Sequence, residues 1–249
     1  AKEDGLLWAG TIPGGLFKST DHGTSWQLVR ELWDHEGRRK WWPGGIGLPG
    51  IHSVCVHPTD SRRIAIGVST AGVWVTTDGG KSWEQQGYGM RSEYMPPEQA
   101  GDPAAQDVHM LVQCAADPKR MYIQHHNGMF VSRDEGRNFT EIHEAGPSTF
   151  GFAAAVHPKD PDTAWFIPGI KDEKRTTVDG KLVVTRTRDG AKTFEVLTKG
   201  LPQQHAYDLV YRHGLAVDES GDRLAFGSTT GGLWVSENGG DDWTAVSNT

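Results

Sequence analysis

Cysteine is scarce in this sequence, which contains only Cys55 and Cys114. Two cysteines exclude a disulfide-stapled scaffold and any multi-cysteine zinc or iron–sulfur site. Basic residues are not in excess, because 25 Lys and Arg stand against 32 Asp and Glu and give a formal charge of −7. This balance argues against a nucleic-acid-binding protein. No run approaches the roughly 18 apolar residues of a membrane-spanning helix, and no signal peptide is visible. We therefore expect a soluble protein, cytoplasmic or secreted, of undetermined oligomeric state.

Turn-forming and large aromatic residues, in contrast, are abundant. The 249 residues include 32 glycines, 13 prolines and 10 tryptophans. Many turns combined with large aromatic side chains favour short strands over long helices. A chain of this length can bury roughly 70–75% of its unfolded surface, so a substantial core needs no covalent support.

One short motif recurs five times along the chain. Its central Asp or Asn stands at positions 21, 78, 134, 189 and 238, so successive copies are 57, 56, 55 and 49 residues apart. The copies are Ser19–Trp26, Thr76–Trp83, Ser132–Phe139, Thr187–Phe194 and Ser236–Trp243. Short alternating apolar runs flank each copy, which predicts a β-hairpin. Two further strands precede most hairpins, so each repeat is a four-stranded meander of the kind that forms a propeller blade.

The repeated motif resembles the Asp-box, or BNR, repeat of sialidase-like and sortilin-like β-propellers, over nearly the whole chain. The resemblance implies an all-β propeller whose Asp-box turns are structural and lie on the face opposite the central pocket. It specifies the architecture and says little about function. The Arg-Ile-Pro segment of sialidases does not occur, since Thr11-Ile12-Pro13 lacks the arginine. A sialidase mechanism is therefore not supported.

The number of strands predicts about five blades in a single propeller domain over residues 1–249. The first blade has only its second, third and fourth strands, at Leu6–Ala9, Gly15–Phe17 and Trp26–Val29. Either a five-bladed ring closes without one inner strand, or the chain is part of a longer ring. We favour the longer ring, because unpaired strand edges promote aggregation.

Candidate functional residues gather in the long connections on the face opposite the Asp-box turns, where a rigid scaffold tends to carry its binding groups. His52 and His213 occupy equivalent positions five residues before the first turn of their repeats, so both should approach the ring axis. Converging imidazoles can bind a divalent metal such as zinc or manganese or transfer protons. The alternative is that each histidine bonds its own loop. The metal-ligand candidates are His52, His109, His125 and His213.

Aromatic, basic and acidic side chains on the same connections complete the candidate site. Aromatic faces beside polar groups suit sugar stacking, and arginine can bind a carboxylate. An alternative is that the aromatic rings only pack the loops. The substrate-binding candidates are Trp33, Trp41, Trp42, Arg38, Tyr207, Tyr211 and Arg212. The catalytic candidates are His52, His213, His205, Asp208 and Asp34.

Two functions remain open at this point. The first, which the resemblance implies, is a glycan-directed enzyme similar to BNR glycoside hydrolases, either hydrolase-like or lyase-like, with a divalent metal as its candidate cofactor. The second is a non-enzymatic propeller scaffold that binds a peptide, a protein or a glycan. Stoichiometric metal in the purified protein would favour the first hypothesis.

Overall fold

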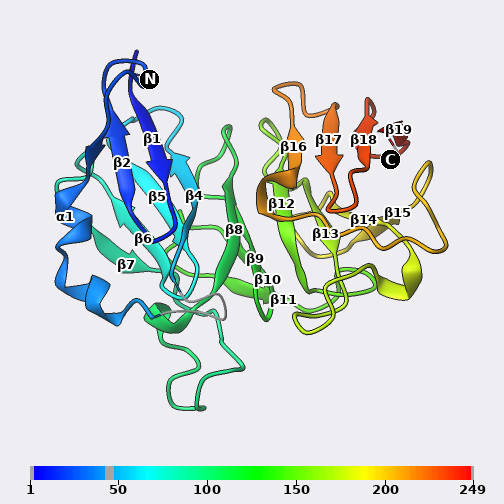
Figure 1. Cartoon of the computed structure of the whole chain (residues 1–249), viewed down its shortest axis with the longest axis horizontal. Helices are drawn as coiled ribbons and strands as arrows, with labels where there is room; N and C mark the ends of the chain where they lie inside the picture. Colours follow the sequence, from blue (N-terminus) through cyan, green and yellow to red (C-terminus); the bar gives the residue numbers. More distant parts are fainter. Residues whose placement is uncertain (1–2, 43–47, 248–249) are drawn as a thin grey trace.

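The computed structural model describes residues 3–42 and 48–247, which form five antiparallel sheets in chain order (Figure 1). The first sheet contains β1 (Leu7–Gly10), β2 (Leu16–Ser19) and β3 (Gln27–Leu28). The second contains β4 (Ile51–Val56), β5 (Ile64–Val68), β6 (Gly72–Thr76) and β7 (Glu84–Gln86). The third contains β8 (Val108–Gln113), β9 (Met121–His125), β10 (Gly128–Ser132) and β11 (Thr140–Ile142).

The fourth sheet contains β12 (Gly151–Val156), β13 (Ala164–Pro168), β14 (Val184–Thr187) and β15 (Glu195–Leu197), and the fifth contains β16 (Leu215–Val217), β17 (Leu224–Gly227), β18 (Leu233–Ser236) and β19 (Thr244–Ser247). The helices are α1 (Arg30–Trp33) and the 3₁₀ turns η1 (Glu36–Lys40), η2 (Pro103–Ala105), η3 (Val178–Gly180) and η4 (Arg212–Gly214). The predicted all-β fold of meander blades is confirmed. Among the described residues, no helix is long and apolar enough to cross a membrane.

The inner strands of successive sheets pack side by side. Strand β1 contacts β4, β4 contacts β8, β8 contacts β12, and β12 contacts β16. The first and last sheets lie on opposite sides of an opening in this arc (Figure 1). The first sheet has three strands and lacks an inner one, in agreement with the sequence. The proposal that residues 1–249 belong to a longer ring stays a prediction.

The core lies between the faces of neighbouring sheets rather than inside any one sheet. Trp165 on the fourth sheet packs with Phe226 and Trp234 on the fifth, and Tyr122 on the third packs with Phe166 on the fourth. Every residue of β5, β9, β12 and β13 is buried, because a neighbouring sheet covers each of their faces. Burial of each large side chain contributes about 1.5–3 kcal/mol, so the stack of sheets stabilises itself without a separate core layer.

The Asp-box turns use their acidic residue entirely for local hydrogen bonds. Asp78 accepts the N–H of Ser82 at 2.9 Å and its hydroxyl at 2.6 Å, while Thr76 donates to Asp78 at 2.8 Å and accepts the N–H of Gly80 at 3.0 Å. The Ser82 hydroxyl is the main reason that the pKa of Asp78 falls to about 2. Asp21, Asp134 and Asp189 make the same set of bonds.

The fifth Asp-box has the reverse polarity. The side-chain amide of Asn238 donates to the carboxylate of Asp242 at 3.0 Å, where the other turns have an aspartate that accepts. The backbone N–H of Asp242 still bonds the Asn238 side-chain oxygen at 3.0 Å. The same turn geometry is therefore achieved with donor and acceptor exchanged between the two side chains.

Candidate functional site

The long connections between sheets lie at the end of the inner strands opposite the Asp-box turns. This placement follows from the alternation of strand direction within each sheet. The Asp-box turn precedes the outer strand and the long connection follows it, so the two lie at opposite ends of that strand. In Figure 1 this end is the lower edge, where the connection over residues 87–107 projects farthest. Side chains at the starts of β4, β8 and β12 and in η4 therefore meet at one end of the ring.

The inner strands enclose a cavity of about 520 Å³. Its lining is mainly apolar and includes Val54, Met110 and Val217, with His52 and His213 among its polar residues. The sequence predicts that these two histidines approach the ring axis. In the structure both of them line this cavity.

The ring of His213 contacts the backbone of His52 and not its ring. His213 Nε2 lies 2.6 Å from the carbonyl oxygen of His52 and donates to it. The ring Nε2 of His52 is buried and has no hydrogen-bond partner among the described residues. Burial, followed by the charges of Arg212 and His213, lowers the pKa of His52 to about 3. His52 is therefore neutral at physiological pH.

His125, the third of the predicted metal ligands, already has partners for its ring. Its two ring nitrogens lie 3.0 Å from the backbone nitrogens of Asp107 and Asn127, and the single acceptor nitrogen of the neutral ring accepts one of these N–H groups. The side chain is fully buried, and burial is the main reason that its pKa falls to about 3. The ring of His125 thus holds the start of β8 against the turn after β9.

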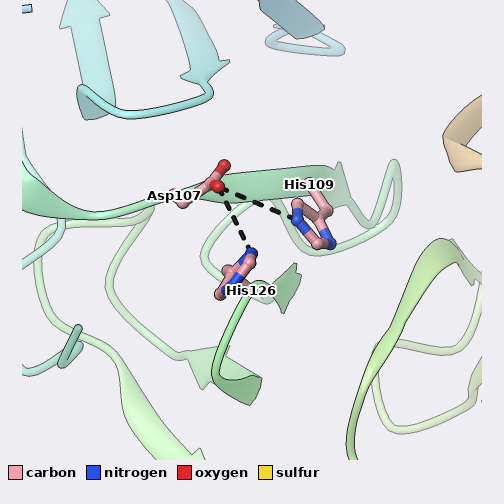
Figure 2. Close-up of side chains that lie close together, drawn as sticks. All are labelled: Asp107, His109 and His126. Atoms are coloured by element: carbon pink, nitrogen blue, oxygen red, sulfur yellow. Dashed lines mark ion pairs between the residues drawn. The ribbon is translucent and has the colours of Figure 1, made fainter. Parts of the chain in front are cut away.

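The fourth predicted metal ligand, His109, lies beside two residues that the sequence analysis did not select (Figure 2). Asp107 precedes β8, His109 lies within it, and His126 follows β9. Asp107 Oδ2 is 3.5 Å from His126 Nδ1 and 3.9 Å from His109 Nε2. His109 Nδ1 is 2.7 Å from the carbonyl oxygen of Gly151 and donates to it.

Burial perturbs the titration of this group. Burial raises the pKa of Asp107, and the charges of His126 and Arg212 oppose that rise. Burial also lowers the pKa of His109 well below its ordinary value, so this ring is neutral. Asp107 Oδ1 is buried and has no hydrogen-bond partner in the part of the chain that the structure describes.

A β-bulge aims the side chains at the start of the inner strands. The pairing register shifts between Ile51 and Ser53, between Val108 and Met110, and between Gly151 and Ala153. His52, His109 and Phe152 are the residues at these three bulges. A bulge rotates a side chain out of the regular alternation, so the repeat itself places these rings at the end of the ring.

Six rings form a continuous row across this end of the molecule, which we call the aromatic row. Neighbouring ring centroids along it are 5.6, 5.5, 5.4, 4.4 and 4.8 Å apart. The members in order are Trp42, Tyr94, His126, His109, Phe152 and Tyr211. Tyr94 is 38% and Tyr211 40% exposed, so solvent reaches the row. The guanidinium groups of Arg175 and Arg212 each stand 5.3 Å from the centre of the Phe152 ring.

Several predicted substrate-binding residues lie outside the aromatic row. The guanidinium of Arg38 stacks on Trp33 at 3.7 Å and donates to the carbonyl of Gly14. Trp41 is buried and packs its ring 5.7 Å from that of Trp74. These contacts fix the loop that carries α1 and η1 to the first two sheets.

The remaining candidates lie in two further places. His205 and Asp208 line a second cavity of about 560 Å³ on the fifth sheet, where Asp208 accepts the hydroxyls of Ser228 and Thr230. Asp34 follows α1 and lies 3.6 Å from Arg30. Tyr207 is 69% exposed. The candidate catalytic residues are thus divided among three locations, and the structure joins only His52 with His213 and His205 with Asp208.

Comparisons with known proteins agree with this architecture. The family model of the BNR/Asp-box repeat matches residues 74–85. No curated protein matches the sequence. Among solved structures, the GH74 xyloglucanase from Xanthomonas campestris superposes with a TM-score of 0.65 at 20% identity, over 98% of this chain and 37% of that one. The GH74 enzyme from Niastella koreensis gives 0.59 at 19%, over 96% and 36%.

A structure of YCF48 bound to a D1 peptide is also similar, with a TM-score of 0.57 at 14% identity over 97% of this chain and 64% of that one. The chain therefore spans between about a quarter and two-fifths of the GH74 chains it matches, and about two thirds of YCF48. These identities show the fold alone. The five repeated turns and the five meander sheets define the class as a β-propeller. Within that class, the chain carries the BNR/Asp-box repeat, whose family model matches residues 74–85.

Proposed function

We propose that this chain is a glycan-directed, hydrolase-like propeller protein that binds a glycan along the aromatic row. The observation that carries the proposal is the row itself, which places solvent-accessible rings beside the partly buried carboxyl group of Asp107 and the guanidinium groups of Arg175 and Arg212. Aromatic faces flanked by a few fixed polar groups are the usual lining of a sugar-binding site. The likeness to GH74 structures, one of which is a xyloglucanase, supports a plant-type β-glucan as the first ligand to test.

Among the catalytic candidates, His52 and His213 are those beside the row. The charge of Arg212, whose side chain lies over the Phe152 ring of the row, also acts on His52. We therefore propose that His213 transfers a proton if the bound glycan is cleaved. His205, Asp208 and Asp34 have no contact with the row in the described residues, so their substitution should leave glycan binding unchanged.

The test measures binding of a panel of soluble glycans, with xyloglucan first, by calorimetry, and release of reducing ends in parallel. Tyr94→Ala and Tyr211→Ala should each weaken binding roughly tenfold, because one aromatic contact contributes about 0.5–1.5 kcal/mol. Tyr88→Ala is the matched control, since Tyr88 is 50% exposed but pairs with Asn138 of an Asp-box turn. An equal loss in all three variants, or no binding to any glycan, would contradict the proposal.

A peptide-binding scaffold is the second candidate, and one observation favours it. Arg212 is largely buried beside the row, and its Nε has no hydrogen-bond partner among the described residues. A guanidinium held in this way suits a carboxylate of a peptide, and the similar YCF48 structure has a bound D1 peptide. Acidic peptides that bind the wild type and not Arg212→Ala, together with an absence of glycan binding, would support the scaffold.

A further inference from the structure

We infer that Asp107, His109 and His126 form a binding site for one divalent transition-metal ion, for which Zn²⁺ is the best match. Two imidazoles and one carboxylate are a donor set that zinc uses in sites with an open coordination position. Only His109 of this set was among the metal ligands predicted from the sequence. The proposal does not depend on glycan binding, because it concerns the metal alone.

The separations of the ligand atoms fit a single ion. One ligand atom from each of the three residues lies within 4.8 Å of the others. Two ligands that each stand about 2.1 Å from a tetrahedral zinc ion are about 3.4 Å apart. The observed 3.5 and 3.9 Å from Asp107 Oδ2 to the two histidines are close to that value. Binding of one ion requires the ligand atoms of any pair to approach each other by at most about 1.4 Å.

The hydrogen bonding of His109 fixes which nitrogen faces the carboxylate. Because Nδ1 donates to the carbonyl of Gly151, Nε2 is the ring nitrogen that can bind an ion. A backbone carbonyl behind the opposite ring nitrogen is the usual support of a metal-binding histidine. The Phe152 ring stacks on His109 at a centroid distance of 4.4 Å and an interplanar angle of 14°, and so holds the imidazole in this orientation.

The side chains of Asp107 and His109 face each other without a hydrogen bond between them. Nε2 of His109 and Oδ2 of Asp107 stand 3.9 Å apart, which is too long for a hydrogen bond. The second carboxylate oxygen, Oδ1, is buried without a partner in the described chain. Leaving a buried acceptor unsatisfied is costly. A cation bound between the two residues would satisfy both of them.

One nearby positive charge, that of Arg212, opposes a cation at this site. Arg212 acts on Asp107 through its charge, but among the described residues no hydrogen bond joins the two side chains. His126 is the most exposed of the three proposed ligands, with 23% of its side chain accessible to solvent. An ion can therefore reach the site from solvent on the side of His126. The row continues from His126 to Tyr94, so an exogenous ligand could complete the coordination at this position.

The experiment uses the whole chain after treatment with a chelator. Zn²⁺ alone is titrated by calorimetry, and Co²⁺ provides a visible absorption band that reports tetrahedral nitrogen and oxygen ligands. We expect one ion per chain. His126→Gln and Asp107→Asn should each weaken Zn²⁺ binding at least about 100-fold, since each removes a direct ligand. Zn²⁺ should also raise the melting temperature of the wild type and not that of His126→Gln.

Two histidine variants serve as controls. His143→Gln removes an exposed histidine beside Glu141, and His205→Gln removes one on the fifth sheet. Both should bind Zn²⁺ as the wild type does. Failure of the wild type to bind Zn²⁺ or Co²⁺, or unchanged affinity in His126→Gln, would overturn the proposal. If Asp107→Asn does not fold, His126→Gln alone decides, because its side chain is partly exposed and its loss spares the buried core.

Discussion

Replacement of Arg186 by alanine tests how the fourth and fifth sheets are held together. Arg186 lies on β14, and only 3% of its side chain is exposed. Its guanidinium donates to the Gly239 carbonyl at 2.6 Å, to Asp241 at 2.6 Å and to Glu195 at 2.8 Å. Gly239 and Asp241 belong to the Asp-box turn of the fifth sheet, so one buried side chain joins the two sheets.

The expected loss follows from the exposure of each partner. Glu195 and Asp241 are 55% and 52% exposed and regain water when Arg186 is removed, so each lost pair counts for about 0.2–1 kcal/mol. The charge-assisted bond to the Gly239 carbonyl contributes about 1.5–3 kcal/mol, although that oxygen keeps its bond from Trp165 Nε1 at 2.8 Å. Lost packing of the methylene groups adds about 1 kcal/mol after the gain in side-chain entropy. Arg186→Ala should therefore destabilise the protein by about 3–6 kcal/mol.

Arg188 offers a matched control, because it approaches the same two carboxylates at 3.3 and 3.6 Å but is 54% exposed. Arg188→Ala should cost less than about 1 kcal/mol. Urea unfolding followed by far-UV circular dichroism measures both values. If the two variants differ by less than about 1 kcal/mol, the burial argument for Arg186 is refuted. A separate early transition in Arg186→Ala would show that the fifth sheet unfolds by itself.

Three further predictions concern the turns and the thiols. Asn238→Asp should lower the melting temperature by about 2–4 °C, because it brings a second carboxylate against that of Asp242. Adding Asp242→Ser should restore the melting temperature. No recovery in differential scanning calorimetry would contradict the reversed polarity. The pKa of Asp78 is about 2, below its ordinary 3.8, so its contribution to stability is complete above about pH 4 and disappears as pH falls through 2; urea midpoints measured against pH should decline in that window, less in Asp78→Asn. Burial raises the pKa of Cys55 to about 12, and Cys55 and Cys114 are both free; native protein should react with Ellman's reagent at pH 8 at least about tenfold more slowly than unfolded protein.

The repeat architecture could be predicted because the Asp-box is a local structure. The bonds that close each turn join residues no more than four positions apart, as between Asp78 and Ser82. A pattern of eight residues therefore contains all the information that the turn needs. The flanking alternation then determines the hairpin, and the spacing determines the number of sheets. The three-stranded first sheet followed from the same reasoning.

The position of the candidate site was only partly visible in the sequence. Counting five residues back from the turn residues His57, His157 and Asp218 selects His52, Phe152 and His213, of which the sequence analysis noticed only the two histidines. His109 stands eight residues before Asp117, because the third repeat is longer at this point. A complete alignment of the repeats would have added Phe152 to the candidate residues. It would not have revealed the bulges, which depend on strand pairing.

The contacts that make this site chemically distinct depend on the tertiary structure. Asp107 and His126 are 19 positions apart, and they meet because β8 and β9 pair in one register while His125 bonds the backbone of Asp107. Trp41 could equally have been exposed, but the packing of the first two sheets buries it against Trp74. The sequence alone determined the local turns and strands, because their bonds are short-range. Only the curvature of the arc decided which side chains converge at its end, because the distances between side chains on different sheets depend on how whole sheets pack.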